Sequence, residues 1–272
     1  MPSSDTILDT HLTWRDVEAE LQKSLSITAK FGKNKRASVL GKMRGFISRI
    51  ALIEPDWIDI PKDIMLPEQL VVKIPSNIAL FDLLPIIGFL RDGTENSEQN
   101  ENDYEEIRED VKRMHNLEVQ MYSVIARSNN IHLPTTEIYA SKFFTAENQS
   151  KGFLISEYIP DAHFVPMFEN ISYQDLLPVI DAIAAFSALG ETMSKEEKQA
   201  TIGGRFIEEN IRNFYPDNIV DIIRKELMDV LGDSYKTEIN TAMETFSLIT
   251  GKTGVLENYS NISRLLGVNS IL

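Results

Sequence analysis

Cysteine is missing from the 272-residue sequence. Its absence excludes disulfides, thiolate nucleophiles, Cys-ligated zinc and iron–sulfur clusters, and is typical of a reducing compartment. The sequence also lacks an apolar run near the ~20 residues that a membrane span needs. Its first residues have neither the basic nor the apolar region of a signal peptide. Together these absences predict a cytoplasmic protein.

Positive charge is scarce. The chain has 27 basic and 41 acidic residues, and its formal net charge at pH 7 is −14. A field of this sign repels phosphate backbones and anionic lipid. We therefore expect no nucleic-acid partner and no membrane-surface partner.

Histidine is scarce too, and several catalytic motifs are missing. The four histidines have no pair at helical metal-ligand spacing, so we expect no metal site and surface or loop positions for all four: His11, His115, His132 and His163. No Gly-x-Ser-x-Gly elbow exists. Gly251-Lys252-Thr253 resembles the end of a Walker A loop, but position 246 is Phe where that loop needs Gly.

Charge is distributed unevenly along the chain. Residues 30–49 contain seven Lys or Arg and no acidic residue, which makes a basic island in an acidic protein. Residues 92–110 contain nine carboxylates and one Arg among polar residues. That composition cannot bury enough apolar area to order itself. We predict a mobile loop over about 92–103 and an acidic first turn of a helix from Tyr104.

The first half of the chain shows both strand and helix patterns. Apolar runs at 46–53 and 70–74 are joined by a Pro-containing connection, which predicts an antiparallel pair of strands. Residues 114–127 have apolar side chains at helical spacing, and two further strand candidates follow at 136–144 and 152–158.

The second half is predicted to be almost entirely helical. Ser172 with Asp175 forms a cap signature for a helix that Pro178 would bend or shorten. Further amphipathic stretches lie at 204–214, 219–231, 235–249 and 256–266. The order of elements predicts an α+β protein with two lobes and a cleft at their junction. We place a β-rich lobe at 1–158 and a helical lobe at 159–272.

Three features of the first lobe each have a functional and an ordinary explanation. Gly41 and Gly45 precede the first strand inside the basic island, where backbone N–H groups could approach phosphates, or could simply form a hairpin turn. Lys73 interrupts an apolar strand and needs either a partner or an edge position. Glu118 could point at Lys73 across the lobe, or could be a solvated helix carboxylate.

The order of these features resembles that of a kinase N-lobe: a Gly-containing loop on a strand, a lysine on a later strand and a glutamate on the next helix. The sequence is similar to the CHK kinase-like family, the invertebrate relatives of choline kinases, ecdysteroid kinases and aminoglycoside phosphotransferases. The motifs run through nearly the whole chain: His11-Leu12-Thr13-Trp14, Gly45-Phe46-Ile47-Ser48-Arg49-Ile50, Ile53-Glu54-Pro55-Asp56-Trp57, Leu70-Val71-Val72-Lys73-Ile74-Pro75, His115-Asn116-Leu117-Glu118-Val119, Ile155-Ser156-Glu157-Tyr158 and Ala184-Ala185-Phe186-Ser187-Ala188-Leu189-Gly190.

The resemblance implies a protein-kinase-like fold that takes ATP with magnesium. It implies that Lys73 contacts phosphate and that Glu118 is its helix partner. It implies that residues from Gly41 through Gly45 to Ser48 cover the phosphates. It also implies a hinge that contacts adenine, formed by Ser156, Glu157 and Tyr158. One departure is Met43, where the family commonly has another glycine, and a side chain there would narrow the approach to the phosphates.

A larger departure is the lack of a catalytic loop. Relatives continue into His-Gly-Asp-Leu-Trp and a later magnesium-binding Asp, whereas this sequence ends at Leu272 with no His-x-Asp motif. We therefore expect a truncated kinase-like fold, with a complete N-lobe and an incomplete C-lobe, and assign no catalytic or metal-binding residue. The resemblance implies a lineage function of ATP-dependent phosphorylation of a hydroxyl on a small molecule. The alternative is a non-catalytic pseudokinase that binds nucleotide or a protein partner.

Overall fold

The computed structural model describes residues 5–41, 48–76, 101–128, 130, 132–162, 165, 169–202 and 219–250. The chain forms two compact units. The first consists of Met1–Asp82 with Asn100–Met193, and the second of Leu83–Gln99 with Ser194–Leu272. Each unit is described by itself.

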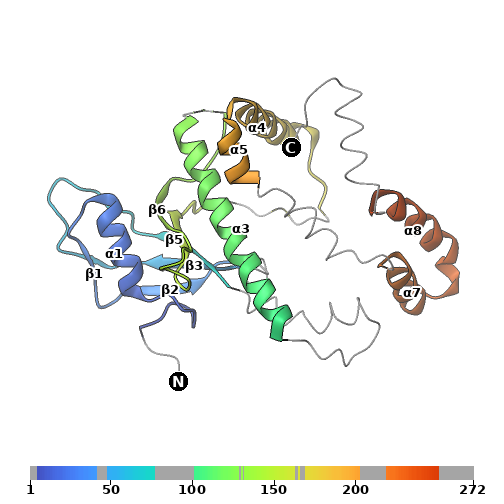
Figure 1. The fold of residues 1–272 in the computed structure, drawn as a ribbon, viewed down its shortest axis with the longest axis horizontal. Helices are drawn as coiled ribbons and strands as arrows, with labels where there is room; N and C mark the ends of the chain where they lie inside the picture. Colours follow the sequence, from blue (N-terminus) through green and yellow to red (C-terminus); the bar gives the residue numbers. More distant parts are fainter. Residues whose placement is uncertain are drawn as a thin grey trace. The chain divides into compact units, whose positions relative to one another are not determined.

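A five-stranded sheet is the centre of the first unit (Figure 1). Its strands lie in the order β2-β3-β5-β7-β6, and each pairs antiparallel with its neighbours. Their bounds are β2 Arg36–Val39, β3 Ser48–Glu54, β5 Leu70–Pro75, β6 Ile138–Lys142 and β7 Phe153–Glu157. The predicted antiparallel pairing of 46–53 with 70–74 is confirmed for the described residues, as are the two later strands.

Helix α1, Trp14–Leu25, covers one face of this sheet. Thr13 and Asp16 form a capping box, because each side chain accepts a hydrogen bond from the other residue's backbone N–H. After α1 the chain forms a small two-stranded sheet from β1, Lys30–Phe31, and β4, Trp57–Ile58. Helix α1 and the strands β1, β2 and β4 were not predicted from the sequence.

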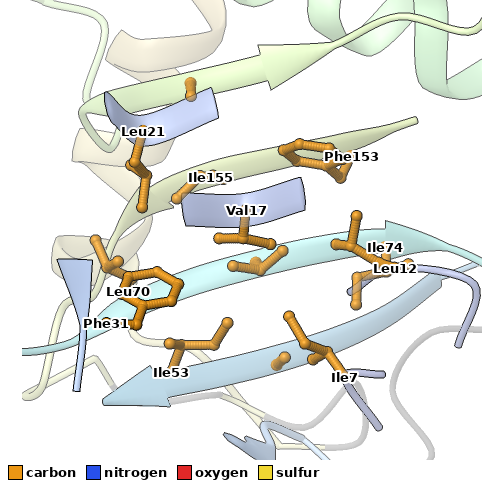
Figure 2. Packing of buried hydrophobic residues seen from close by; sticks show 13 residues of the cluster. Ile7, Leu12, Val17, Leu21, Phe31, Ile53, Leu70, Ile74, Phe153 and Ile155 are labelled. Atoms are coloured by element: carbon orange, nitrogen blue, oxygen red, sulfur yellow. The ribbon is translucent and has the colours of Figure 1, made fainter. Parts of the chain in front are cut away.

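The hydrophobic core lies between α1 and the sheet (Figure 2). Val17 and Leu21 of α1 point toward the sheet, and both are fully buried. Alternate residues of each strand meet them, because successive side chains of a strand point to opposite faces. On the strands, this cluster contains Ala51, Ile53, Leu70, Val72, Ile74, Ala140, Phe153 and Ile155.

Helix α3, Glu101–Ser128, lies on the opposite face of the sheet, where it contacts β5 and β6. The predicted helix over 114–127 lies within it. Because α3 begins at Glu101, the last residues of the acidic segment that we expected to be a loop, 101–103, are helical. The preceding part of that predicted loop, 92–100, lies outside the described residues.

Helix α4, Tyr173–Thr192, completes the described part of the first unit. Its N-cap is Ser172, whose hydroxyl accepts from the backbone N–H of Asp175 at 3.2 Å, as the sequence predicted. Of the two effects predicted for Pro178, shortening of the helix is wrong, since α4 continues through it to Thr192, and bending stays a prediction. Pro178 is the sixth residue of the helix and removes one backbone N–H donor from it.

The described part of the second unit is helical. It contains α5 Lys195–Ile202, α7 Ile219–Leu231, the short 3₁₀ helix η1 Asp233–Tyr235 and α8 Lys236–Thr250. The predicted helices at 219–231 and 235–249 are confirmed, whereas those at 204–214 and 256–266 lie outside the described residues. The chain is therefore of mixed α+β class. Among the residues described, no helix combines the length and apolar character required to span a membrane.

Candidate functional site

Lys73 lies on β5, the central strand of the five-stranded sheet. Its neighbours Val72 and Ile74 belong to the buried cluster under α1. The alternation of a strand therefore directs the Lys73 side chain to the other face, toward α3. A lysine on a central strand cannot be explained as an edge residue, which was the ordinary alternative for this position.

Glu118 of α3 meets Lys73 on that face. The Lys73 Nζ atom lies 2.7 Å from Oε1 and 2.6 Å from Oε2 of Glu118. Each side chain of the pair is 29% exposed. Glu118 is thus not a solvated helix carboxylate, and the pair is open enough for a solute to reach the ammonium group.

The residues around Lys73 on this face are mainly apolar. The strand register places Ile50 of β3 and Leu154 of β7 directly beside Lys73. Two residues before Lys73, on the same face of β5, Val71 pairs with Leu52 of β3 and with Ser156 of β7. Leu154 and Ser156 are buried, whereas Ile50, Leu52 and Val71 are half-buried.

The glycine segment is described only at its two ends. Gly41 follows β2 and has a φ of 72°, a left-handed conformation that favours glycine. Ser48 is the first residue of β3 and pairs with Pro75, two residues beyond Lys73. Gly45 and Met43 lie outside the described residues. The hairpin therefore connects β2 to β3, and β3 pairs directly with β5, the strand of Lys73.

The three predicted hinge residues lie at the end of β7, the strand that pairs with β5 on the side opposite to β3. Ser156 and Glu157 end β7, and Tyr158 comes directly after it. The Ser156 hydroxyl donates to the Glu157 carbonyl at 3.3 Å, and the Glu157 backbone N–H donates to the Glu137 carbonyl at 2.9 Å. Ser156 lies on the Lys73 face, because it pairs with Val71.

Asn116 fixes α3 to the chain that follows β6. Its Nδ2 donates to the backbone carbonyl of Phe144 at 2.9 Å, and its Oδ1 accepts from the Phe144 backbone N–H at 2.9 Å. Glu118 lies only two residues after Asn116 in the same helix. The reciprocal pair of hydrogen bonds therefore helps to set the position of Glu118 over the sheet.

His115 is a residue whose place our sequence analysis got wrong. We expected a surface or loop position, but His115 lies within α3 and is only 3% exposed. Its Nε2 lies 2.9 Å from the carbonyl oxygen of Lys142, and its ring makes an edge contact with Phe144 at a centroid distance of 5.3 Å. Burial lowers the pKa of His115; its bond to Lys142 and the charge of Glu118 oppose this effect.

Tyr122 lies one turn after Glu118 on the same helix. Burial, followed by the charge of Glu118, raises the pKa of its phenol. Sequence reasoning named neither Tyr122 nor Asn116 as a site residue. The helical spacing of His115, Glu118 and Tyr122 is the signal that places all three on one face of α3.

In the part of the site that the structure describes, an ammonium group held by a carboxylate lies beside an apolar strand face. This arrangement can bind a polyanion through Lys73 and pack a flat apolar group against Ile50, Leu52 and Val71. The described residues contain no group of three or more His, Asp or Glu side chains that could hold a metal ion.

Comparison with known proteins gave one match. The model of a family described as "Uncharacterized oxidoreductase dhs-27", DUF1679, matches residues 1–272. No curated protein and no solved structure matched the chain.

Proposed function

The chain belongs to the DUF1679 family, and we propose that its first unit binds the phosphates of ATP, together with magnesium, through Lys73 in a fold of the small-molecule phosphotransferase type. The observation that carries the proposal is the bidentate contact between Lys73 and Glu118 across the central strand and α3. Site residues Gly41, Gly45 and Ser48 would cover the phosphates, and Ser156, Glu157 and Tyr158 would contact the base.

The chemistry of an ammonium group supports phosphate binding here. Lysine has three N–H donors, and two of them meet the Glu118 oxygens. The third is left for a phosphate oxygen. The carboxylate also keeps the side chain in one orientation before the ligand arrives, which reduces the entropy lost on binding.

The apolar strand face supports binding of the base. Three half-buried apolar side chains lie on the Lys73 face of the sheet. Ile50 pairs with Lys73, and Leu52 pairs with Val71, two residues before Lys73. A nucleotide needs both kinds of surface, with a charge for its phosphates and an apolar plane for its base. Bound ATP with magnesium would supply the phosphoryl group, and the residues named above would hold and orient it.

The family's description includes the word oxidoreductase, so nicotinamide binding has to be compared. A dinucleotide-binding fold needs parallel strands, with a glycine-rich turn from a strand into a helix N-terminus. In the residues that the structure describes, every pairing between strands is antiparallel. Gly41, the described glycine of the predicted phosphate-covering segment, lies between two antiparallel strands rather than before a helix. These features favour phosphate binding of the kinase type.

Nucleotide binding is the part of the family chemistry that the Lys73 site supports. Transfer of the phosphoryl group to a small-molecule hydroxyl would need a residue that accepts the hydroxyl proton, and no His-x-Asp motif occurs in the sequence. Binding without transfer would make these 272 residues a nucleotide-sensing module that signals to a protein partner.

Thermal unfolding of the 272-residue chain tests the proposal. ATP with magnesium at about 100 times its Kd contributes about 2.7 kcal/mol, which raises the Tm by about 5 to 10 °C for a chain of this size. The variant Lys73→Ala should lose this shift. NADPH at the same concentration is the comparison ligand. A larger shift with NADPH that persists in Lys73→Ala would overturn the proposal in favour of a dinucleotide site elsewhere.

A further inference from the structure

A cluster of three residues joins α3 to the chain after β6. It consists of His115 and Asn116 on α3 and of Phe144, two residues beyond the end of β6. Asn116 exchanges two hydrogen bonds with the Phe144 backbone, and the His115 ring packs edge-on against the Phe144 ring. We call this cluster the α3 clamp.

The hydrogen bond of His115 fixes its tautomer. A backbone carbonyl can only accept, so the Nε2 atom that lies 2.9 Å from the Lys142 oxygen must carry the proton. In a neutral imidazole the other nitrogen, Nδ1, then has no proton. This Nδ1 atom is buried and has no hydrogen-bond partner among the described residues.

Protonation of His115 would place a donor where no acceptor exists. The imidazolium Nδ1–H would be buried without a partner, which is a costly arrangement. Two charged groups face the ring: Glu118 of the same helix, which favours the imidazolium, and Lys73 of β5, which disfavours it. On β6 the Lys142 carbonyl contacts the ring, whereas the Lys142 ammonium lies 3.9 Å from Glu20.

We propose that His115 is a positioning residue for the Lys73–Glu118 pair: its neutral ring holds α3 against the end of β6, and its protonation releases the α3 clamp. Glu118 lies one turn after His115 on α3, so a movement of the helix at His115 also moves the carboxylate away from Lys73. The clamp itself does not depend on the proposed function. Its consequence, a nucleotide affinity that depends on pH, rests on that function.

The sign of the effect follows from burial. The clamped state disfavours the proton, so the pKa of His115 in that state lies below its ordinary value of 6.5. The released state binds the proton more readily. The clamped state is therefore fully favoured above the ordinary pKa and loses stability as the pH falls through and below it.

Hydrogen exchange of the Phe144 amide measures the clamp without any ligand. This N–H donates to Asn116 Oδ1, so it exchanges only when the clamp opens. The protection factor, which corrects for the intrinsic effect of pH on exchange, should fall by up to about tenfold between pH 7.5 and 5.5. His115→Gln keeps a donor near the Nε2 position but cannot be protonated, so its protection factor should stay constant.

A matched control is His132→Gln, because His132 is exposed in the chain after α3. It should keep the wild-type pH profile. If His115→Gln destabilises the fold too far for exchange, the His115 ring can be titrated in the wild-type chain by NMR. The midpoint should then lie below 6.5, at the acid end of the pH range over which Phe144 protection is lost. Equal pH profiles in the wild type and His115→Gln, or a ring titration without any change at Phe144, would overturn the proposal.

The consequence for nucleotide binding is measured as a ratio, since the terminal phosphate of ATP titrates in the same range. The Kd of wild type divided by that of His115→Gln cancels the titration of the ligand and should rise as the pH falls from 7.5 to 5.5. A constant ratio would show that the clamp does not reach Lys73 and would overturn the positioning role. If no form of the chain binds ATP while the Phe144 profile behaves as expected, the proposed function fails and the clamp stands.

Discussion

Glu118 of α3 holds Lys73 of β5 by both carboxylate oxygens, at 2.7 and 2.6 Å, although 45 positions separate the two residues in the sequence. The pair joins a helix on one face of the sheet to the central strand. Because each side chain is 29% exposed, water screens the interaction, and its net contribution to stability is small, about 1 kcal/mol or less. Its main effect is on the orientation of the ammonium group.

Replacement of the carboxylate should separate binding from stability. Glu118→Gln removes the charge that orients Lys73 and should weaken ATP·Mg binding about tenfold, which corresponds to about 1.4 kcal/mol. The free energy of unfolding should change by about 1 kcal/mol or less. Glu109→Gln is the matched control, because it makes the same change on the exposed side of α3, where Glu109 pairs only with Lys112. Unfolding in urea and calorimetric titration measure both quantities.

Removal of the Asn116 amide should cost more stability than removal of Glu118's charge. Asn116→Ala deletes two hydrogen bonds and leaves the N–H and C=O of Phe144 unpaired. Each bond contributes about 1 kcal/mol, so a loss of about 2 kcal/mol in the free energy of unfolding is expected, together with weaker ATP·Mg binding. Ser123→Ala, whose hydroxyl bonds only to the carbonyl of Val119 in its own helix, should change neither quantity. An equal loss in both variants would contradict the role of Asn116.

Gly152 provides the space in which the Phe144 ring lies. A Cβ atom on Gly152 would come within 2.3 Å of the ring, so Phe144 would have to move away from its position beside His115. Gly152→Ala should destabilise the chain by about 1 to 3 kcal/mol. The double variant Gly152→Ala with Phe144→Leu should recover part of that loss. Gly190→Ala, in open space within α4, should instead stabilise the helix by about 0.5 to 1 kcal/mol.

Much of this arrangement could be predicted from local sequence. The antiparallel strands follow from apolar runs with a turn between them, and Ser172 marks the start of α4. Lys73 and Glu118 could be paired because a charge in an apolar strand needs a partner and the family resemblance supplied one. Helix α1 also has a sequence signature, since Thr13 and Asp16 have the spacing of a capping box, and its buried residues Val17 and Leu21 lie one turn apart.

The position of His115 could not be predicted in the same way. Its partners are the Lys142 carbonyl, 27 residues away, and the Phe144 ring. A backbone carbonyl has no sequence signature, and the contact depends on how α3 lies over the sheet. A lone histidine therefore resembles any surface histidine until the packing is known.

Strand β2 was missed for a different reason, because its four residues lie in the charge-rich basic island.

Acid should weaken the ion pair that connects α1 to the loop between β6 and β7. Lys151 Nζ contacts both carboxylate oxygens of Asp16, at 2.7 and 2.8 Å. Burial opposes the ionised form of Asp16, but hydrogen bonds from Lys151 and Thr13 outweigh it and lower the pKa below the ordinary value of 3.8. The stabilisation is thus present above pH 3.8 and lost as the pH falls through the folded-state pKa.

Lys151→Met tests this pH dependence. The variant should be less stable than the wild type by about 1 kcal/mol at pH 7, and the difference should shrink below pH 3.8 as Asp16 gains its proton in both chains. Urea unfolding at a series of pH values measures it. A stability difference that is the same at pH 7 and in strong acid would mean that Lys151 acts by packing rather than by charge.

Calorimetric titration of ATP·Mg into three forms of the chain tests the central claim most directly. The forms are the wild type, Lys73→Met and Lys62→Met, and the last removes the same charge from an exposed residue between β4 and β5. The account predicts a measurable Kd for the wild type and Lys62→Met, and at least about a tenfold weaker one, a loss of about 1.4 kcal/mol or more, for Lys73→Met. Equal affinities in all three forms would contradict it.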